Sequence, residues 1–164
     1  MLIRRAIPTD AAAICDIWNV VIRDTLLTFT SDEKSPDALR QVVNNRGPAF
    51  LVAETEEGHL IGFASYGAFR PGPGYDFTRE HTVMMASSAR GQGIGRMLME
   101  ALEQVAISEN VMSLIGGVSG ANSGGISFHQ SLGFEIVGRI PKAGHKSGQW
   151  IELIFMQKLL TVPH

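Results

Sequence analysis

The sequence of 164 residues contains little cysteine and no surplus of charge of one sign. Cys15 is the only cysteine, which excludes an intramolecular disulfide and a cysteine-rich metal site. Lysine and arginine together number 14, and aspartate and glutamate number 16, so the net charge is −2. No long run of either sign is present. We therefore expect no nucleic-acid partner, because nucleic-acid binding draws on a basic surface.

Long hydrophobic runs are also absent. Charged residues appear within positions 1–5, so the apolar stretch of a signal peptide is missing. The apolar runs at 49–53 and 151–156 are far shorter than the roughly 20 residues that cross a bilayer. We expect a cytoplasmic protein without a membrane partner. Apolar side chains still make up 45% of the residues and charged ones 18%, so residues 1–164 are predicted to bury one core as a single domain.

Hydrophobic periodicity and turn residues predict a chain that mixes strands and helices. Strands are expected at 2–6, 49–54, 60–66, 79–86, 112–118, 134–138 and 150–156. Helices are expected after Pro8-Thr9-Asp10, between Ser35-Pro36 and Gly47-Pro48, from about 95 to 109, and at 126–132. The basic segment 142–148 contains glycine and is interpreted as a connection between the last two strands. This order predicts an α/β or α+β fold.

The segment 24–35 has no clear period. It combines threonines with Leu26, Leu27 and Phe29, which is typical of a loop that carries apolar side chains. Such a loop either forms one wall of a pocket or is simply packed onto the core, and the sequence leaves both open.

A glycine-rich loop lies between the strand that ends near 83–85 and the helix from about 95. Its residues are Arg90, Gly91, Gln92, Gly93, Ile94 and Gly95, followed by Arg96. Glycines let the backbone approach a ligand, and the free amides of a first helical turn attract an anion. Arg90 adds a charge that suits phosphate oxygens. The spacing matches neither GxxxxGK followed by Ser or Thr nor GxGxxG, so a pyrophosphate site of another kind and a loop without function both stay open.

A second motif favours the pyrophosphate site. Residues 122–134 read NSGGISFHQSLGF, and together with RGQGIG they resemble the acetyl-CoA-binding core of the Gcn5-related N-acetyltransferase (GNAT) superfamily. Arg90, Gly91, Gly93 and Gly95 match the loop that holds the pyrophosphate there, and Asn122, Phe128, Gly133 and Phe134 match the helix that flanks the thiol. The resemblance implies acetyl-CoA as co-substrate. It also implies a mixed, mostly antiparallel central sheet of about seven strands, flanked by helices on both faces.

Further motifs along nearly the whole chain resemble the phosphinothricin and methionine sulfoximine N-acetyltransferase branch of that superfamily. They are Phe69-Arg70-Pro71, Tyr75, Thr78, Glu80-His81, Leu132-Gly133-Phe134, Val137-Gly138, Gly144-His145-Lys146, Gly148, Trp150 and Phe155-Met156-Gln157. The chain departs from the branch at Thr82-Val83-Met84-Met85, at Gly124-Gly125, and at Ser119-Gly120, where an acidic residue is common. These departures bear on substrate preference and rate rather than on the fold.

The resemblance implies two catalytic residues. Acetyl transfer needs a base for the ammonium group, stabilisation of the oxyanion, and a proton for the departing thiolate. Glu80 matches the base of the branch, and His129 matches the residue that protonates the thiolate. An exposed carboxylate and a structural histidine are the alternatives. Cys15 has no histidine nearby in sequence, so we expect direct attack by the amine in a ternary complex, without a metal.

Binding roles follow from the same resemblance. The coenzyme contacts would be the backbone amides of Val83, Met84 and Met85, the loop 90–96, the side chain of Asn122, and Ser131. A plain helix cap at Asn122 and an ordinary core strand at 83–85 are the competing explanations. The amine substrate would contact Arg70, Pro73, Gly74 and Tyr75. A homodimer is implied, and Lys142, His145 and Lys146 either approach the site from the neighbouring subunit or are solvated.

We therefore expect an N-acetyltransferase that moves the acetyl group of acetyl-CoA to the α-amine of a small amino-acid analogue, such as phosphinothricin, methionine sulfoximine or methionine sulfone. Two alternatives stay open. The first is acetylation of other amines, such as peptide N-termini or polyamines, although carboxylates would line a polyamine site and Arg70 is offered here. The second is a regulatory module that binds acetyl-CoA without catalysis.

Overall fold

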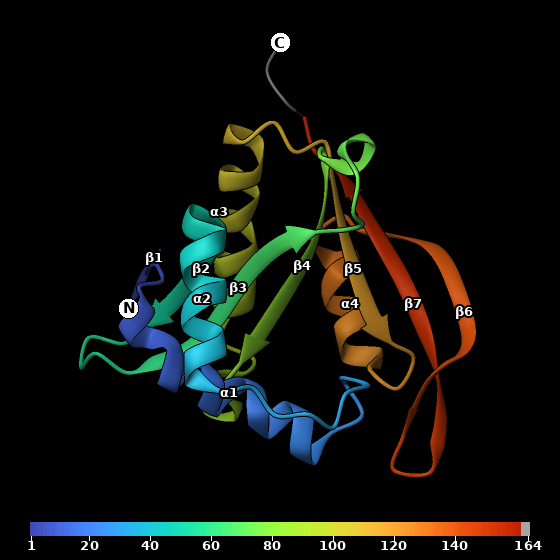
Figure 1. The fold of residues 1–164 in the computed structure, drawn as a ribbon, viewed down its shortest axis with the longest axis horizontal. Coiled ribbons are helices and arrows are strands. Elements are labelled where there is room, and N and C mark those ends of the chain that lie inside the picture. Colours follow the sequence, from blue (N-terminus) through green and yellow to red (C-terminus); the bar gives the residue numbers. More distant parts are fainter. Residues whose placement is uncertain (162–164) are drawn as a thin grey trace.

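A computed structural model of the chain describes residues 1–161 as a seven-stranded sheet with helices on both faces (Figure 1). The strands are β1 (Leu2–Arg5), β2 (Phe50–Glu54), β3 (Leu60–Ala68), β4 (Thr78–Met85), β5 (Ser113–Ser119), β6 (Glu135–Lys146) and β7 (Gln149–Leu159). The helices are α1 (Ala11–Asp24), α2 (Pro36–Arg46), α3 (Ile94–Ser108) and α4 (Ser123–Ser131). The strand order is β1-β2-β3-β4-β5-β7-β6; β4 and β5 are parallel and the other neighbours are antiparallel. The expected mixed, mostly antiparallel sheet is therefore confirmed.

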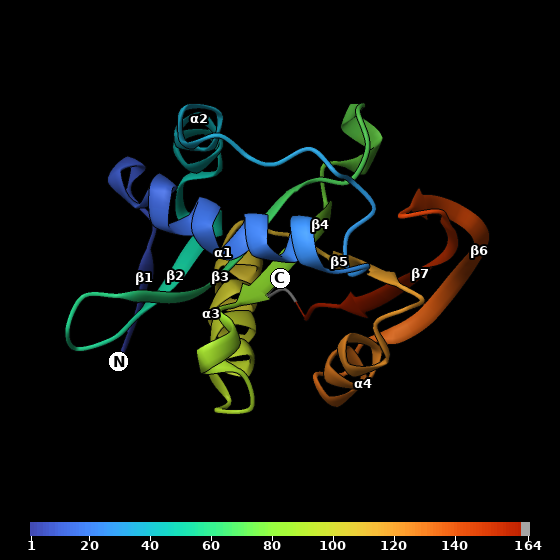
Figure 2. The same ribbon diagram turned by 90° about the horizontal axis from the view of Figure 1, so that it is seen from below.

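Each face of the sheet carries its own hydrophobic core. The view from below shows α1 and α2 on one face of the sheet and α3 on the other (Figure 2). Side chains alternate along β2, so Leu51 and Ala53 join the core under α3, while Phe50 and Val52 join the core under α1 and α2. The helices complete these cores with Leu98, Met99 and Leu102 on one face, and with Ile14, Ile17, Leu39 and Val43 on the other. Because both faces are covered, a ligand reaches the sheet at its strand ends or between its strands. No helix within residues 1–161 is long and apolar enough to cross a membrane.

The ends of α2 lie where the sequence predicts them. The Ser35 hydroxyl accepts a hydrogen bond from the amide of Ala38 (3.2 Å), and Pro36 occupies the first helical position. Gly47 ends the helix with a φ of +54°, which glycine adopts without strain, and its amide donates to the Val43 carbonyl. These local signals fix the helix whose last residue, Arg46, reaches the site.

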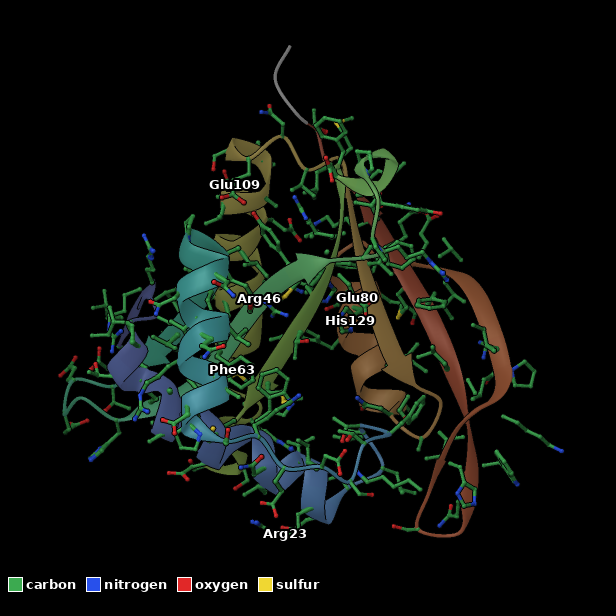
Figure 3. All side chains as sticks on the ribbon, in the orientation of Figure 1. Arg23, Arg46, Phe63, Glu80, Glu109 and His129 are labelled. Atoms are coloured by element: carbon green, nitrogen blue, oxygen red, sulfur yellow. The ribbon has the colours of Figure 1, made fainter. Side chains whose placement is uncertain are left out.

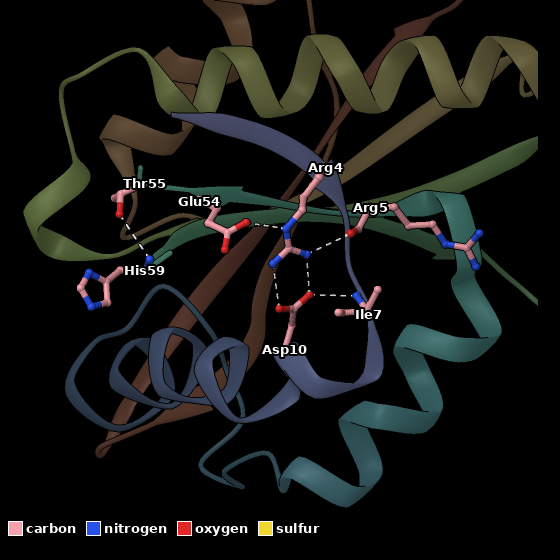
Figure 4. A network of polar contacts seen from close by, with 7 residues as sticks. All are labelled: Arg4, Arg5, Ile7, Asp10, Glu54, Thr55 and His59. Carbon is pink, nitrogen blue, oxygen red and sulfur yellow. Dashed lines mark hydrogen bonds and ion pairs between the residues drawn. The ribbon is translucent and has the colours of Figure 1, made fainter. Parts of the chain in front are cut away.

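A charged network ties the N-terminal strand to the start of α1 (Figure 4). Arg4 donates two hydrogen bonds to Asp10 (2.8 and 3.0 Å) and one to Glu54 on β2 (2.6 Å). Asp10 also accepts from the amide of Ile7 (2.8 Å). Burial alone would raise the pKa of Asp10, but the hydrogen bonds from Arg4 and Ile7 hold it below its ordinary value. The network joins β1, β2 and α1 into one rigid corner.

Strands β4 and β5 separate part of the way along their length (Figure 1). Residues 78–81 pair with 113–116, but the following residues, 82–85 and 117–119, form no ladder with each other. On their outer sides β4 stays paired with β3, and β5 with β7. Alternate residues of a strand point their N–H and C=O groups to opposite sides, so both edges of the gap carry backbone groups without a partner strand. We call the point of separation, at His81 and Gly116, the fork.

The basic segment 142–148 does not form a loop between the last two strands, so this prediction was wrong. Strand β6 continues to Lys146 and β7 begins at Gln149. Only Ser147 and Gly148 form the turn, and both have positive φ (+52° and +72°). A two-residue turn of this kind matches the twist of a hairpin. Glycine and lysine residues typical of loops are therefore built into a long hairpin.

Candidate active site

A cleft with a volume of about 830 Å³ opens where β4 and β5 separate. Its lining contains most of the predicted coenzyme contacts and one predicted catalytic residue: Val83, Met84, Met85, Arg90, Gly91, Gly93, Ile94, Gly95, Arg96, Asn122 and His129. The remaining predicted residues lie outside this lining: Glu80, Gln92, Ser131, Arg70, Pro73, Gly74 and Tyr75. Within residues 1–161, no group of three or more His, Cys, Asp or Glu side chains is placed to hold a metal ion.

The N-terminus of α3 lies at one end of the cleft. Gly91 and Gly93 have positive φ (+74° and +77°), which lets the chain turn sharply into the helix. The amide of Met97 bonds to the carbonyl of Gly93 (3.2 Å), and the helical amides before Met97 have no partner inside the helix. Arg90 lines the cleft beside them. This end of the cleft is therefore suited to an anion, at the positive end of the helix dipole.

Two of the predicted coenzyme contacts are engaged within the protein. The side chain of Gln92 donates to the carbonyl of Ser88 (2.9 Å) and so closes the glycine loop on itself. The hydroxyl of Ser131 donates to the carbonyl of Phe128 (2.6 Å) and accepts from Arg96 (3.1 Å). These bonds join the loop and α4 into a stable frame around the cleft.

Helix α4 begins at Ser123, earlier than predicted, because Asn122 caps it. The Oδ1 atom of Asn122 accepts a hydrogen bond from the amide of Gly125 (2.8 Å). A Cβ atom on Gly125 would overlap the Asn122 side chain, so glycine at this departure from the branch gives the cap its room. Capping fixes Asn122 in the lining of the cleft.

Glu80 lies on β4 one residue before the fork (Figure 3). The residue is exposed, and its Oε1 lies 3.6 Å from the place a Cβ of Gly117 would occupy. Partial loss of hydration raises the pKa of Glu80, and the charge of Arg46 acts in the opposite direction. The Arg46 guanidinium lies over Gly67, the cross-strand partner of Glu80, and donates to the Ser65 hydroxyl (2.8 Å). A carboxylate with a raised pKa beside an open cleft is suited to accept a proton.

His129 is buried against His81, the neighbour of Glu80 on β4. The two Nε2 atoms are 2.8 Å apart, and Nδ1 of His129 lies 2.7 Å from the Gly125 carbonyl, to which it donates. In the neutral ring Nε2 of His129 must then accept from Nε2 of His81, which leaves Nδ1 of His81 buried without a partner. Burial lowers the pKa of both imidazoles, so both are neutral near pH 7. A Cβ on Gly116 would lie 2.9 Å from His81, so this glycine makes room for the pair.

The residues predicted to bind the amine lie on an exposed loop after β3. Arg70 packs over the ring of Phe69 (5.4 Å), which contacts the ring of Tyr75 (6.1 Å). Pro73–Tyr75 forms one short 3-10 turn. This loop lies beyond the Glu80 end of β4, and its residues do not line the cleft of a single chain.

The opposite wall of the cleft comes from α1 and the segment after it. For this segment, the sequence left open whether it lines a pocket or is simply packed onto the core. Its residues, which we call the acceptor wall, are Trp18, Leu27, Thr28, Phe29, Thr30 and Lys34. The ammonium group of Lys34 lies 4.8 Å from the centre of the Trp18 ring. The sequence offered a pocket wall as one of two alternatives for residues 24–35, but it gave no site role to Trp18, Lys34, His81 or Arg46. His81 stands next to Glu80, but no linear pattern shows that it meets His129, 48 positions later.

Comparison with known proteins defines the class. Residues 16–134 match the model of the acetyltransferase (GNAT) family, and the chain belongs to this family. It is 34% identical to the L-methionine sulfoximine/L-methionine sulfone acetyltransferase of Pseudomonas paraeruginosa, across 94% of this chain and 92% of that protein. It is 30% identical to the phosphinothricin N-acetyltransferase of Streptomyces viridochromogenes, across 98% of this chain and 88% of that protein. The predicted family is confirmed, and the chain is an acyltransferase.

Two solved structures share the fold along the whole chain. The ribosomal-protein-alanine N-acetyltransferase of Brucella melitensis is 39% identical with a TM-score of 0.92, covering 98% of this chain and 100% of that one. The structure of yncA from Salmonella typhimurium with its cofactor acetyl-CoA is 32% identical with a TM-score of 0.94, covering 100% of this chain and 96% of that one.

Proposed function

We propose that the protein transfers the acetyl group of acetyl-CoA to the α-amino group of a small amino-acid analogue of the methionine sulfone, methionine sulfoximine or phosphinothricin type. One observation carries this proposal: the separation of β4 and β5 opens a cleft that combines unpaired backbone edges with the free amides of α3, and Glu80 lies on β4 one residue before the point of separation. The activities named for the two relatives support the choice of substrate class.

The residues of the cleft fit acetyl-CoA. A pyrophosphate needs N–H donors and positive charge, and the first amides of α3 and Arg90 offer both. The extended pantetheine arm carries amide groups, so it can pair with the backbone of 83–85 as an added strand would. Such pairing uses main-chain atoms, which makes methionine at 84 and 85 compatible with it. When bound, the coenzyme supplies an activated acetyl thioester.

Glu80 acts as the base in this proposal. It takes a proton from the substrate ammonium group, directly or through a water, and so frees the nitrogen lone pair. The amine then attacks the thioester carbonyl directly: the C–N bond forms, the C–S bond breaks to release the thiolate, and the nitrogen loses its surplus proton to solvent. Cys15 is buried in α1 and takes no part.

In this proposal His129 gives the proton to the departing thiolate, and its contact with His81 controls whether it has a proton to give. In the neutral pair, Nε2 of His129 accepts and has no proton to give. To donate, His129 must therefore take up a proton from solvent and release its contact with His81, so that its Nε2–H can point to the thiolate. Its proposed role thus depends on His81, which holds that nitrogen in the neutral pair.

The amine substrate is held by the loop after β3 in this proposal. Arg70 can form two parallel hydrogen bonds to a carboxylate or a phosphinate, with Pro73, Gly74 and Tyr75 shaping the side-chain pocket. In the single chain this loop is exposed. A substrate bound beside Glu80 would therefore contact the loop on one side only.

A homodimer is part of the proposal. Strand β6 is an edge of the sheet, and Val137 and Ile140 on it, with Trp150 on β7, expose large apolar side chains. Two copies joined through this surface would cover them. Analytical ultracentrifugation tests this assembly, and a monomer at micromolar concentration would contradict it. We also propose a cytoplasmic location, which cell fractionation tests.

A turnover screen tests the proposed function. The purified protein and acetyl-CoA are mixed with methionine sulfone, methionine sulfoximine, phosphinothricin, free amino acids, a polyamine, or a peptide with N-terminal alanine, and free thiol is measured. We expect thiol release with the amino-acid analogues, and their N-acetyl products by mass spectrometry. The peptide is included because the Brucella melitensis structure is named for that activity. Turnover of the peptide alone would replace the proposed substrate, and coenzyme binding without any turnover would favour the regulatory module.

A further inference from the structure

Lys146, near the end of β6, has an unusual environment for a lysine. Only 5% of its surface is exposed. Its Nζ atom donates to the carbonyls of Ile22, Thr25 and Thr28 (2.6, 2.8 and 2.9 Å), and the Thr28 hydroxyl lies 3.2 Å away. The three ammonium protons therefore have three carbonyl acceptors.

These acceptors belong to the end of α1 and to the segment that follows it. The last carbonyls of a helix have no partner within the helix, and they carry the negative end of its dipole. A cation there satisfies carbonyls that burial would otherwise leave unpaired. Burial lowers the pKa of Lys146, and the surrounding oxygens favour its charged form. Lys146 therefore determines the path of the chain as it leaves α1.

Two further contacts hold the same segment against the sheet. The ring of Phe29 lies on Gly144, where a Cβ atom would be 2.5 Å from the ring. The hydroxyl of Ser119, at the end of β5, donates to the carbonyl of Leu26 (2.8 Å). All three contacts come from β5 and β6, which lie on the same side of the fork. The segment that they hold contributes residues 27–30 to the acceptor wall.

We propose that Lys146 is a positioning residue for the acceptor substrate: its ammonium group, bonded to three carbonyls after α1, holds residues 27–30 in the shape that the amine substrate meets. This inference rests on the proposed function for its effect on turnover. Lys146 does not touch the substrate, and it acts through Thr28 and Phe29. The coenzyme end of the cleft, at α3, shares no contact with it.

Replacing Lys146 by methionine tests the proposal, because methionine keeps the apolar stem and loses the three donors. We expect KM for the amine to rise about tenfold or more, while the Kd for acetyl-CoA stays unchanged. Amide hydrogen exchange in residues 25–30 should become faster, and exchange in α3 should not change. Arg40→Met, which removes an exposed cation on α2 outside the cleft, is the control and should behave as wild type.

Gly144→Ala provides a second variant with the ammonium intact, and it should raise KM for the amine by displacing Phe29. The proposal is overturned if exchange in residues 25–30 is unchanged in K146M, or if KM for the amine and Kd for acetyl-CoA worsen equally, as a general loss of stability would cause. If K146M fails to fold, an unchanged KM in G144A overturns it. If the wild-type protein acetylated no amine, the proposed function would fail, and hydrogen exchange would still decide whether Lys146 holds this segment.

Discussion

The two halves of β4 differ in which of their atoms the site uses. In the first half, residues 78–81, the strand is paired with β5 and, from Arg79 onward, with β3, and the side chains of Glu80 and His81 belong to the proposed reactive centre. In the second half, residues 82–85, one edge is unpaired and faces the cleft, so the backbone is what a ligand meets. One strand thus supplies fixed side chains on one side of the fork and free peptide groups on the other.

This difference suits the departures from the branch to the proposed site. In the proposal, the first half needs a carboxylate at 80 and, for the histidine pair, an imidazole at 81. The second half needs side chains that fill their places in the two cores: Met84 packs on the α1 side and Met85 on the α3 side. Methionines are accommodated there because the peptide groups are independent of side-chain identity.

The largest expected effect is on turnover, from Glu80→Gln in the first half. We expect kcat to fall about 10²- to 10⁴-fold, because glutamine cannot take the ammonium proton. The affinity for acetyl-CoA, measured by calorimetry, should not change. Glu135→Gln removes an exposed carboxylate on β6 and serves as the control. Wild-type kcat across pH in E80Q would assign the base to another group.

Alanine at Gly116, opposite His81, should reduce stability. Its Cβ would lie 2.9 Å from His81 and 3.3 Å from His129, so the pair must move apart. We expect the free energy of unfolding in urea to fall by about 1–3 kcal/mol. Gly117→Ala is the control, since that Cβ would meet its neighbours at 3.5 and 3.6 Å, an ordinary contact distance. Equal free energies of unfolding for the two variants would show that the histidine pair can accommodate an added methyl group.

Acid should also destabilise the protein through the pair that His81, in the first half of β4, forms with His129 on α4. Burial keeps the pKa of His81 and His129 below the ordinary value in the folded chain, so below about pH 6.5 the unfolded chain binds protons that the folded chain does not. The contribution of the neutral pair to stability is complete above that pH and decreases as the pH falls, by up to about 1.4 kcal/mol per pH unit for each histidine that stays unprotonated in the folded chain. Urea unfolding at several pH values measures this slope, with the exposed His59→Gln as control. A flat profile would contradict the assignment of a neutral pair.

The smallest effect is expected in the second half. Met84→Leu conserves volume, so stability should change by less than about 1.5 kcal/mol and turnover by less than about tenfold. Thiol release and urea unfolding check both values. A larger loss of turnover with intact stability would show that the side chain at 84, and not only its backbone, takes part in the reaction.

Local features of the site could be predicted from the sequence, and distant contacts could not. The sharp turn at Gly91 and Gly93 and the helix after it could be predicted from local residue types, but the loop alone left a phosphate site and a loop without function both open. The bond from Lys146 to Ile22 spans 124 positions, and no periodic pattern encodes it. Gly144 was interpreted as a loop residue, although its role is to make room for Phe29. Such contacts arise only when the sheet brings separate elements together.

The two tryptophans of the chain lie in different surroundings, and this offers an optical readout. Trp150 is 65% exposed beside His145 on the hairpin, whereas Trp18 lines the cleft beneath Lys34. In Trp150→Phe the remaining fluorophore would report ligand entry through a change in emission. In Trp18→Phe the remaining Trp150 would report association of two copies, because iodide would quench the fluorescence of Trp150 less once its surface is covered.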